Sequence, residues 1–255
     1  MVRLTFLGTG TSQGVPMIGC DCPVCNSADP RDKRLRSAVL IEDEKTRIVI
    51  DSGPDFRYQM LRAGLKSIDA ILLTHEHTDH IIGLDDVRAF NYFCQKSVDV
   101  WATERVQRVV KKSFDYAFDE KPYPGAPHIT LNTITDKPFR VGTLEVTPIF
   151  GRHFTLPITG YRIGPVAYLT DFNHIEESEL EKLQGVELFV VNALRHKRHL
   201  SHFTLGEAME IARRVGAPRT YFTHLSHQIG LHAEENAKLP EGMALAHDTL
   251  TIEIP

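Results

Sequence analysis

The segment between Ile68 and Leu84 constrains the fold of this chain more than any other. Residues 68–73 are rich in Ile and Leu, which is typical of a buried strand, and Thr-His-Glu-His-Thr-Asp-His follows them directly. This polar stretch places three imidazoles and the carboxylate of Asp79 within six residues. A buried strand that gives way to metal-ligating side chains predicts a metal site at the edge of a β-sheet.

The spacing within this segment predicts two adjacent metal ions. His75 and His77 are two residues apart, so an extended chain places both rings on one side, where they can share an ion. Asp79 and His80 follow where a helix is expected to begin, with Thr78 as its N-cap, so they point elsewhere and can serve a second ion. The alternative is a surface turn that happens to be rich in His, but the density of ligands favours the metal site.

Three more of the expected strands end at a residue that can bind a metal, namely His153, Asp171 and His224. The alternatives are a loop histidine at position 153 and coincidental strand ends at the other two. With the first segment they give seven candidate ligands, which is enough for two ions that share one carboxylate. Imidazole and carboxylate ligands without thiolate suit Zn²⁺, Mn²⁺ or Fe.

A separate cluster of thiols lies in the irregular segment 13–36, as Cys20-x-Cys22-x-x-Cys25. Three thiols this close cannot comfortably pair in disulfides, but they can converge on one structural Zn²⁺ if a fourth ligand arrives. His227 is the candidate for this fourth ligand. It would fasten the segment 13–36 against the end of the expected strand that leads to His224. Reduced cysteines in a loop are the alternative.

Asp51 ends the sequence Arg-Ile-Val-Ile-Asp, where another strand is expected to stop. A carboxylate there can accept a hydrogen bond from a metal-bound histidine and so orient its ring. It can equally be a residue that forms a turn before Gly53, and the sequence does not choose between the two.

Composition narrows the class of protein. The chain has 255 residues and no Pro, Gly or Ser-rich linker, so we expect one domain over residues 1–255. A formal charge of −4 without a long basic run predicts no extended nucleic-acid surface and favours a small substrate. The stretch Met1–Gly8 is too short for a signal peptide, and no apolar run approaches the roughly 18 residues that span a bilayer. We therefore expect a cytoplasmic protein that does not enter membranes.

Patterns along the rest of the chain predict mixed sheets covered by helices, because strands and helices alternate in the second half beside strand pairs that look antiparallel. The expected strands are 3–7, 37–42, 47–51, 70–74, 98–101, 129–133, 144–150, 159–163, 166–170, 188–192 and 220–222. The expected helices include 55–64, 104–114, 176–183 and 204–215.

These residues resemble the signature of the metallo-β-lactamase superfamily. The likeness rests on His75-Glu-His77-Thr-Asp79-His80 with His153, Asp171 and His224 downstream. It implies an α/β fold, an αββα sandwich of two mixed β-sheets flanked by helices, with the two metals at one edge between the sheets.

Within the superfamily the chain is most similar to the phosphoribosyl cyclic phosphate phosphodiesterases of phosphonate degradation. Shared stretches include Leu7-Gly-Thr-Gly, the cysteine cluster, and Thr223-His224-x-Ser226-His227-Gln228. In that family three cysteines and a later histidine hold a structural zinc, which matches Cys20, Cys22, Cys25 and His227. A further family histidine assists catalysis beside the metals, and Ser201-His202-Phe203 matches its position. The resemblance also implies a homodimer.

The expected activity is metal-dependent hydrolysis of a small phosphodiester, such as a cyclic ribose phosphate or nucleotide. A hydroxide shared by the two ions would attack phosphorus, and His202 would stabilise the developing charge or protonate the leaving oxygen. The expected ligands are His75, His77 and His153 for one ion, Asp79, His80 and His224 for the other, and Asp171 as the bridge. Asp79 is counted with His202 among the catalytic residues.

Three alternatives remain from the sequence. A tRNA-processing endoribonuclease shares the chemistry but would need a basic arm, which we do not see. Another hydrolase of this fold, acting on a thioester or lactone, would keep the same ligands. A metal-stabilised binding protein would be expected to have lost some of them.

Overall fold

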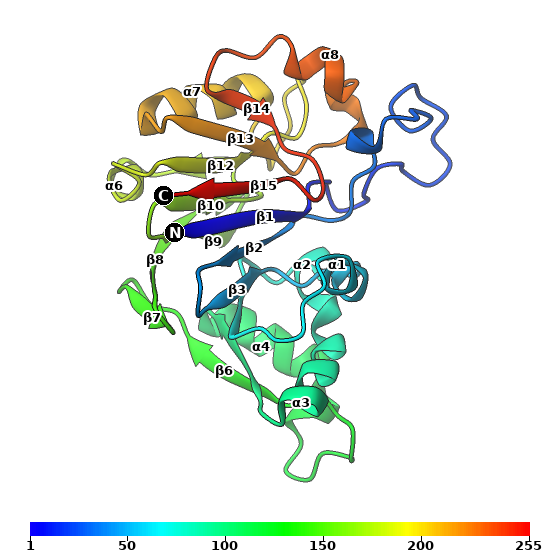
Figure 1. Ribbon diagram of the computed structural model, residues 1–255, viewed down its shortest axis with the longest axis vertical. Helices are drawn as coiled ribbons and strands as arrows, with labels where there is room; N and C mark the ends of the chain where they lie inside the picture. Colours follow the sequence, from blue (N-terminus) through cyan, green and yellow to red (C-terminus); the bar gives the residue numbers. More distant parts are fainter.

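Two β-sheets pack face to face, with helices on their outer sides, in the computed structural model, which describes residues 1–255 (Figure 1). The first sheet has seven strands in the order β15-β1-β2-β3-β4-β5-β6. Their bounds are β1 (Val2–Gly8), β2 (Ala38–Glu42), β3 (Arg47–Ile50), β4 (Ala70–Leu72), β5 (Val98–Ala102), β6 (Ile129–Thr133) and β15 (Thr251–Ile254).

The second sheet follows the order β11-β8-β9-β10-β12-β13-β14, and β7 pairs with β8 off this path. Its strands are β7 (Phe139–Val141), β8 (Leu144–His153), β9 (Leu156–Ile163), β10 (Val166–Leu169), β11 (His174–Ile175), β12 (Leu188–Asn192), β13 (Arg219–Thr223) and β14 (Met243–Leu245). Strands β3 to β6 run parallel, as do β10, β12, β13 and β14, whereas the remaining pairs are antiparallel. Both sheets are therefore mixed, as the sequence predicted.

The helices are short, and most follow a strand. The α-helices are α1 (Phe56–Arg62), α2 (Thr78–Ile81), α3 (Arg88–Cys94), α4 (Glu104–Ser113), α5 (Asp115–Phe118), α6 (Glu177–Glu181), α7 (Leu205–Val215) and α8 (His232–Asn236), and the 3₁₀ helices are η1 (Pro30–Asp32), η2 (Ile82–Val87) and η3 (His227–Ile229). The longest, α7, begins at a capping box formed by Thr204 and Glu207 and ends at Gly216 in the left-handed conformation. None of these helices has the length and hydrophobicity that a membrane-spanning helix requires.

The core has three main layers, and β12 shows why. Leu188 and Val190 face the other sheet, whereas the alternate residues Phe189 and Val191 face the helical layer that includes α7. All four side chains are fully buried, which explains the continuous apolar run in this parallel strand. The third layer lies between the first sheet and its own helices, around residues such as Val49 and Phe90.

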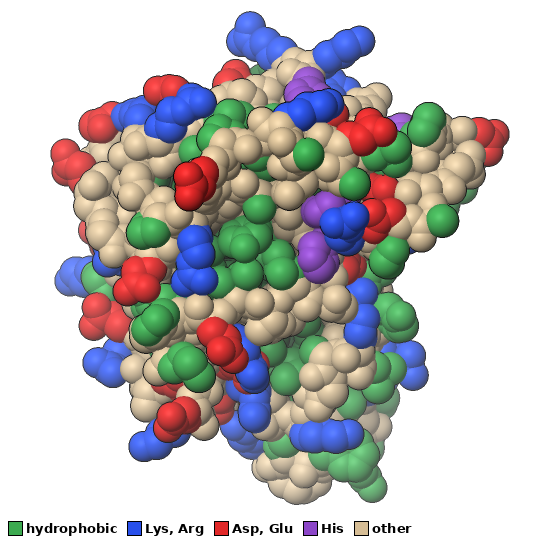
Figure 2. Space-filling model, turned by 45° about the horizontal axis from the view of Figure 1, so that its top comes forward, with side chains coloured by type: hydrophobic (Ala, Val, Ile, Leu, Met, Phe, Trp, Pro, Cys, Tyr) green, Lys and Arg blue, Asp and Glu red, His purple; other side chains and the backbone are tan.

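The predicted elements are confirmed with small shifts at their ends. One local prediction is wrong: the N-cap of α2 is His77, not Thr78, and it makes no side-chain capping bond. The short strands β7, β11, β14 and β15 and the helices α5 and α8 were not predicted. On the face shown in Figure 2, Lys and Arg side chains are interspersed with Asp and Glu around a central group of hydrophobic side chains.

Candidate metal centre

Strand ends from both sheets bring the predicted ligands together. In the first sheet β4 leads to His75 and His77, and α2 then carries Asp79 and His80. In the second sheet β8 ends at His153, and Asp171 and His224 follow β10 and β13 within two residues. Because β10 and β13 run in the same direction on either side of β12, their carboxyl ends reach the same edge.

Hydrogen bonds hold the two sheets together at this edge. The Tyr161 hydroxyl of β9 donates to the carbonyl of Leu73, and the Thr159 amide donates to the carbonyl of Thr74 at 3.0 Å. The chain that carries His75 is thus attached directly to the second sheet. The site therefore depends on the packing of the two sheets and does not belong to either one alone.

Asp171 lies at the centre of the cluster. Its Oδ2 atom is 3.4 Å from His80 Nε2, and its Oδ1 atom is 3.1 Å from His224 Nε2 and 3.6 Å from His202 Nδ1. Two oxygens of one carboxylate thus face different imidazoles, which is the arrangement that a bridging ligand requires. Asp171 is almost completely buried.

The remaining ligand atoms group partly as expected. His75, His77 and His153 have ligand atoms within 4.8 Å of one another, as predicted for the first ion. Asp79, His80 and His224 do not form a comparably tight group. Asp79 Oδ2 lies 3.2 Å from His80 Nε2, and His224 approaches through Asp171. His202, predicted to act beside the metals, falls in a group with His153 and Asp171.

Neighbouring groups fix which imidazole nitrogen is free. The Thr74 hydroxyl donates to Asp51 at 2.9 Å, so it must accept a hydrogen bond from Nδ1–H of His75, which leaves Nε2 with a lone pair. His80 Nδ1 lies 2.6 Å from Asp51 Oδ2. Asp51 is therefore in contact with a candidate ligand, in the geometry expected of an orienting carboxylate.

The second sheet repeats this logic. His153 Nδ1 donates to the carbonyls of Asp171 and Ser201, at 2.9 and 2.8 Å. The Thr170 hydroxyl donates to Asp171 at 2.7 Å and can accept from His224 Nδ1 at 3.4 Å. Sequence reasoning missed the supporting threonines, although a Thr directly precedes His75, Asp171 and His224. That recurrence is the signal that could have identified them.

The electrostatics favour neutral imidazole and ionised carboxylate at most positions, which is the form in which these groups bind metals. Burial lowers the pKa of His75 and His224, and burial together with His224 lowers the pKa of His202 to about 2. Burial alone would raise the pKa of Asp171, but the surrounding histidines hold it well below its usual value.

His80 differs from the other imidazoles because the carboxylates around it act against the effect of burial. Burial would lower its pKa, but Asp51, Asp171 and Asp79 outweigh that effect and raise it well above the usual value. Its Nε2 atom and Nδ1 of His202 are both buried without a hydrogen-bond partner. Buried imidazole nitrogens that lie beside carboxylates and have no hydrogen-bond partner fit a site that binds divalent cations. His77 is exposed, so the group of candidate ligands reaches the protein surface at this residue.

The cysteine cluster forms a second candidate site. Cys20, Cys22, Cys25 and His227 have ligand atoms within 4.8 Å of one another, and none of the cysteines is in a disulfide. His227 Nδ1 lies 3.3 Å from the sulfurs of both Cys20 and Cys22. Figure 1 shows the segment 13–36, which carries these thiols, beside the segment around α8. The predicted set is thus brought together, in a tetrad that suits Zn²⁺.

Comparison with known proteins agrees with this geometry. The beta-lactamase superfamily domain matches residues 46–225, which is more than half of the chain. The chain belongs to the metallo-β-lactamase superfamily, and it has the fold of that superfamily's hydrolases.

The chain can be placed more narrowly. The crystal structure of a diphosphatase from the PhnP family is 43% identical, covers 100% of this chain and 98% of that chain, and superposes with a TM-score of 0.93. At this identity and coverage the chain belongs to the PhnP family, so the expected fold and family are both confirmed.

Two further proteins are similar to this chain. An octanoyltransferase of Porphyromonas gingivalis is 43% identical over 98% of this chain, but the chain spans only 51% of that protein's length. Zn²⁺-bound PqqB from Methylobacterium extorquens superposes with a TM-score of 0.76 at 18% identity, covering 99% of this chain and 100% of that one. The second likeness shows the shared fold alone.

Proposed function

We propose that this protein is a binuclear metal-dependent hydrolase that cleaves a small phosphodiester. The observation that carries the proposal is the convergence of seven candidate nitrogen and oxygen ligands, with Asp171 at the centre, at one edge between the sheets. A phosphodiester carries a negative charge that such a site can neutralise, and a carboxylate-bridged pair of ions suits attack on phosphorus.

Each residue has a defined part in this proposal. His75, His77 and His153 would hold one ion, Asp79, His80 and His224 the other, and Asp171 would bridge them. Divalent ions bound there would supply Lewis-acid activation of water and charge neutralisation. Asp51 and the carbonyl of Ser201 orient His80 and His153, so the ligand geometry is fixed before substrate arrives.

His202 would act on the substrate. Its ring lies 4.9 Å from that of His224 and 4.5 Å from that of His153, measured between ring centres. Because burial keeps this imidazole neutral, it retains one N–H that can donate to a phosphoryl oxygen or to the leaving oxygen. We count Asp79 and His202 as the catalytic residues.

A diphosphate bond is the second candidate substrate, because the 43% identical PhnP-family structure is described as a diphosphatase. Hydrolysis of either bond transfers a phosphoryl group to water. We also propose that residues 1–255 act as one domain, as a homodimer, with a structural Zn²⁺ on Cys20, Cys22, Cys25 and His227. Light scattering and metal analysis test the last two points.

The test of the reaction uses bis(p-nitrophenyl) phosphate, its monoester, a dinucleoside diphosphate, a β-lactam and a thioester. The protein is stripped of metal and reloaded with Zn²⁺ or Mn²⁺. Metal-dependent cleavage of the diester, the diphosphate or both supports phosphoryl chemistry and ranks the two candidates. Turnover of only the thioester or the lactam would overturn the proposal.

A further inference from the structure

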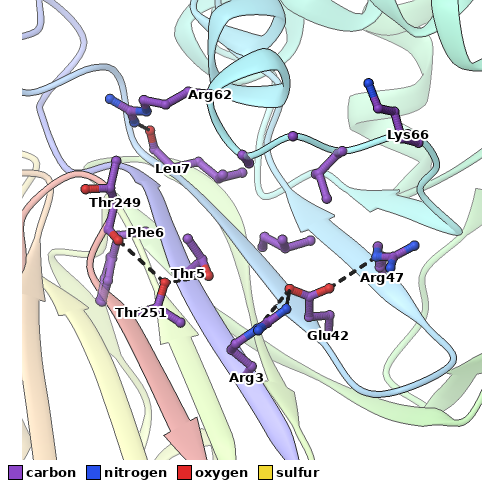
Figure 3. Close-up of a pocket in the computed structure, with 14 residues that line it drawn as sticks. Arg3, Thr5, Phe6, Leu7, Glu42, Arg47, Arg62, Lys66, Thr249 and Thr251 are labelled. Atoms are coloured by element: carbon purple, nitrogen blue, oxygen red, sulfur yellow. Dashed lines mark hydrogen bonds and ion pairs between the residues drawn. The ribbon is translucent and has the colours of Figure 1, made fainter.

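A cavity lies between the first sheet and the end of α1. Its volume is about 440 Å³, and none of the candidate metal ligands lines it. Figure 3 shows side chains from β1, β2 and β3 on one side and from α1 and the following turn on the other. The cavity size falls within the range of small-ligand sites.

Positive charge dominates the lining. The cations are Arg3, Arg47, Arg62 and Lys66, and the carboxylate is Glu42. Glu42 is nearly buried and is shared between two guanidinium groups, at 2.7 Å from Arg3 Nη2 and 3.2 Å from Arg47 Nε. One carboxylate cannot neutralise two guanidinium groups, so this wall keeps an excess positive charge.

The opposite wall adds two more cations. Arg62 Nη2 donates to the carbonyl of Leu7 and lies 3.3 Å from Asp248. Lys66 is exposed and has no ion-pair partner within the cavity. The C-terminus of α1 contributes partial negative charge here, equivalent to about half an electron. The four cations still outweigh the combined negative charge of Glu42, Asp248 and the C-terminus of α1.

Several donors are left for a ligand. Arg3 uses Nε and Nη2 on Glu42, so its Nη1 group is free of protein partners. Arg47 uses Nε on Glu42 and Nη1 on Ser67, which leaves Nη2. Guanidinium groups match the geometry of phosphate oxygens, and Leu40 and Leu65 provide apolar surface beside them.

We propose that this cavity binds a small phosphorylated molecule of about nucleoside monophosphate size. The phosphate would lie among the guanidinium groups and Lys66, and the organic part would lie against the leucines. At the far end lie the hydroxyl groups of Thr5 and Thr251, which are hydrogen-bonded to each other at 3.0 Å. The site is independent of the hydrolytic reaction.

Calorimetric titration of the metal-loaded protein tests this site with AMP, adenosine and inorganic phosphate. We expect AMP to bind to this cavity, inorganic phosphate to bind it more weakly, and adenosine not to bind it. The binding of AMP should weaken with added salt. Lys66→Glu on one wall and Arg47→Gln on the other should each weaken this binding about tenfold. Lys111→Glu, an exposed charge reversal on α4, is the matched control and should leave it unchanged.

Turnover of bis(p-nitrophenyl) phosphate separates this cavity from the metal centre. Lys66→Glu should keep the turnover of the unmodified protein, because Lys66 touches no candidate metal ligand. AMP binding that is equal in Lys66→Glu and Lys111→Glu would overturn the proposal. The proposal would also be overturned if a slowly cleaved diester, competing at the metal centre, displaced all of the bound AMP. In that case the cavity would bind no phosphate.

Discussion

Replacing Gly53 by Ala should damage the metal centre, although Gly53 binds nothing itself. A Cβ at this position would lie 2.0 Å from the backbone oxygen of Asp79, and real Cβ contacts are almost never shorter than 3.0 Å. One of the two segments must therefore move by about 1 Å. The segments cannot separate freely, because the Ser52 amide donates to the carbonyl of His80 and the Gly83 amide donates to the carbonyl of Ser52, both at 2.8 Å.

A shift of about 1 Å in a catalytic group can cost about 100-fold in rate, and we expect a loss of that order in kcat. In the proposed binuclear site the second ion should be lost first, because Asp79 and His80 are its proposed ligands on the displaced segment. The assay is metal content and kcat on bis(p-nitrophenyl) phosphate, measured on folded protein.

Gly206→Ala is the matched control for this substitution. It lies in the first turn of α7, a Cβ there meets nothing within 4 Å, and Ala should be neutral or slightly stabilising. A folded Gly53→Ala protein with two tightly bound ions and full turnover would refute the reasoning.

Three further predictions follow from single contacts. Asp51→Asn should weaken metal binding 10 to 100-fold (an order-of-magnitude expectation), measured by competition with a chelating dye, and unchanged affinity would mean that Asp51 only forms a turn. Cys25→Ser should reduce the zinc content by one ion per chain and lower the melting temperature, while turnover per folded molecule is retained; a loss of turnover at full stability would contradict a structural role. Tyr161→Phe should lower the free energy of unfolding by about 1 kcal/mol in urea, because it leaves the Leu73 carbonyl unpaired, and no change would show that this bond adds nothing.

The sequence singles out four of the candidate ligands, because an expected apolar strand ends at or just before each of them: His75, His153, Asp171 and His224. Asp171 and His224 are 53 residues apart, yet the rule that neighbouring parallel strands end at one edge places them together. Cys20 and His227 are more than 200 residues apart, and their pairing depended on family likeness as much as on chemistry.

Other parts of the site could not be predicted, because they depend on contacts between distant segments. Nothing local indicates that Gly53 must pass close to Asp79, or that the carbonyl of Ser201 supports His153. The same holds for the buried Arg34, which donates to Thr9, to the carbonyl of Ala246 and to His232. These contacts join the segment 13–36 to the C-terminal part of the chain, and only the assembled fold defines them.

The backbone at the strand ends carries a cost that reveals the importance of these side chains. Asp51, Asp171 and His224 all adopt the left-handed conformation, with φ of 65, 65 and 56°. This conformation costs an L-residue roughly 1–2 kcal/mol and costs glycine almost nothing, but glycine has no side chain to offer an ion or a histidine. Asp171→Gly and Asp171→Ala both remove the carboxylate, so their difference isolates the backbone. At ordinary positions the Ala variant is the more stable of the two. Here we expect the Gly variant to be more stable by about 1 kcal/mol in chemical unfolding. A more stable Ala variant would refute backbone strain at this strand end.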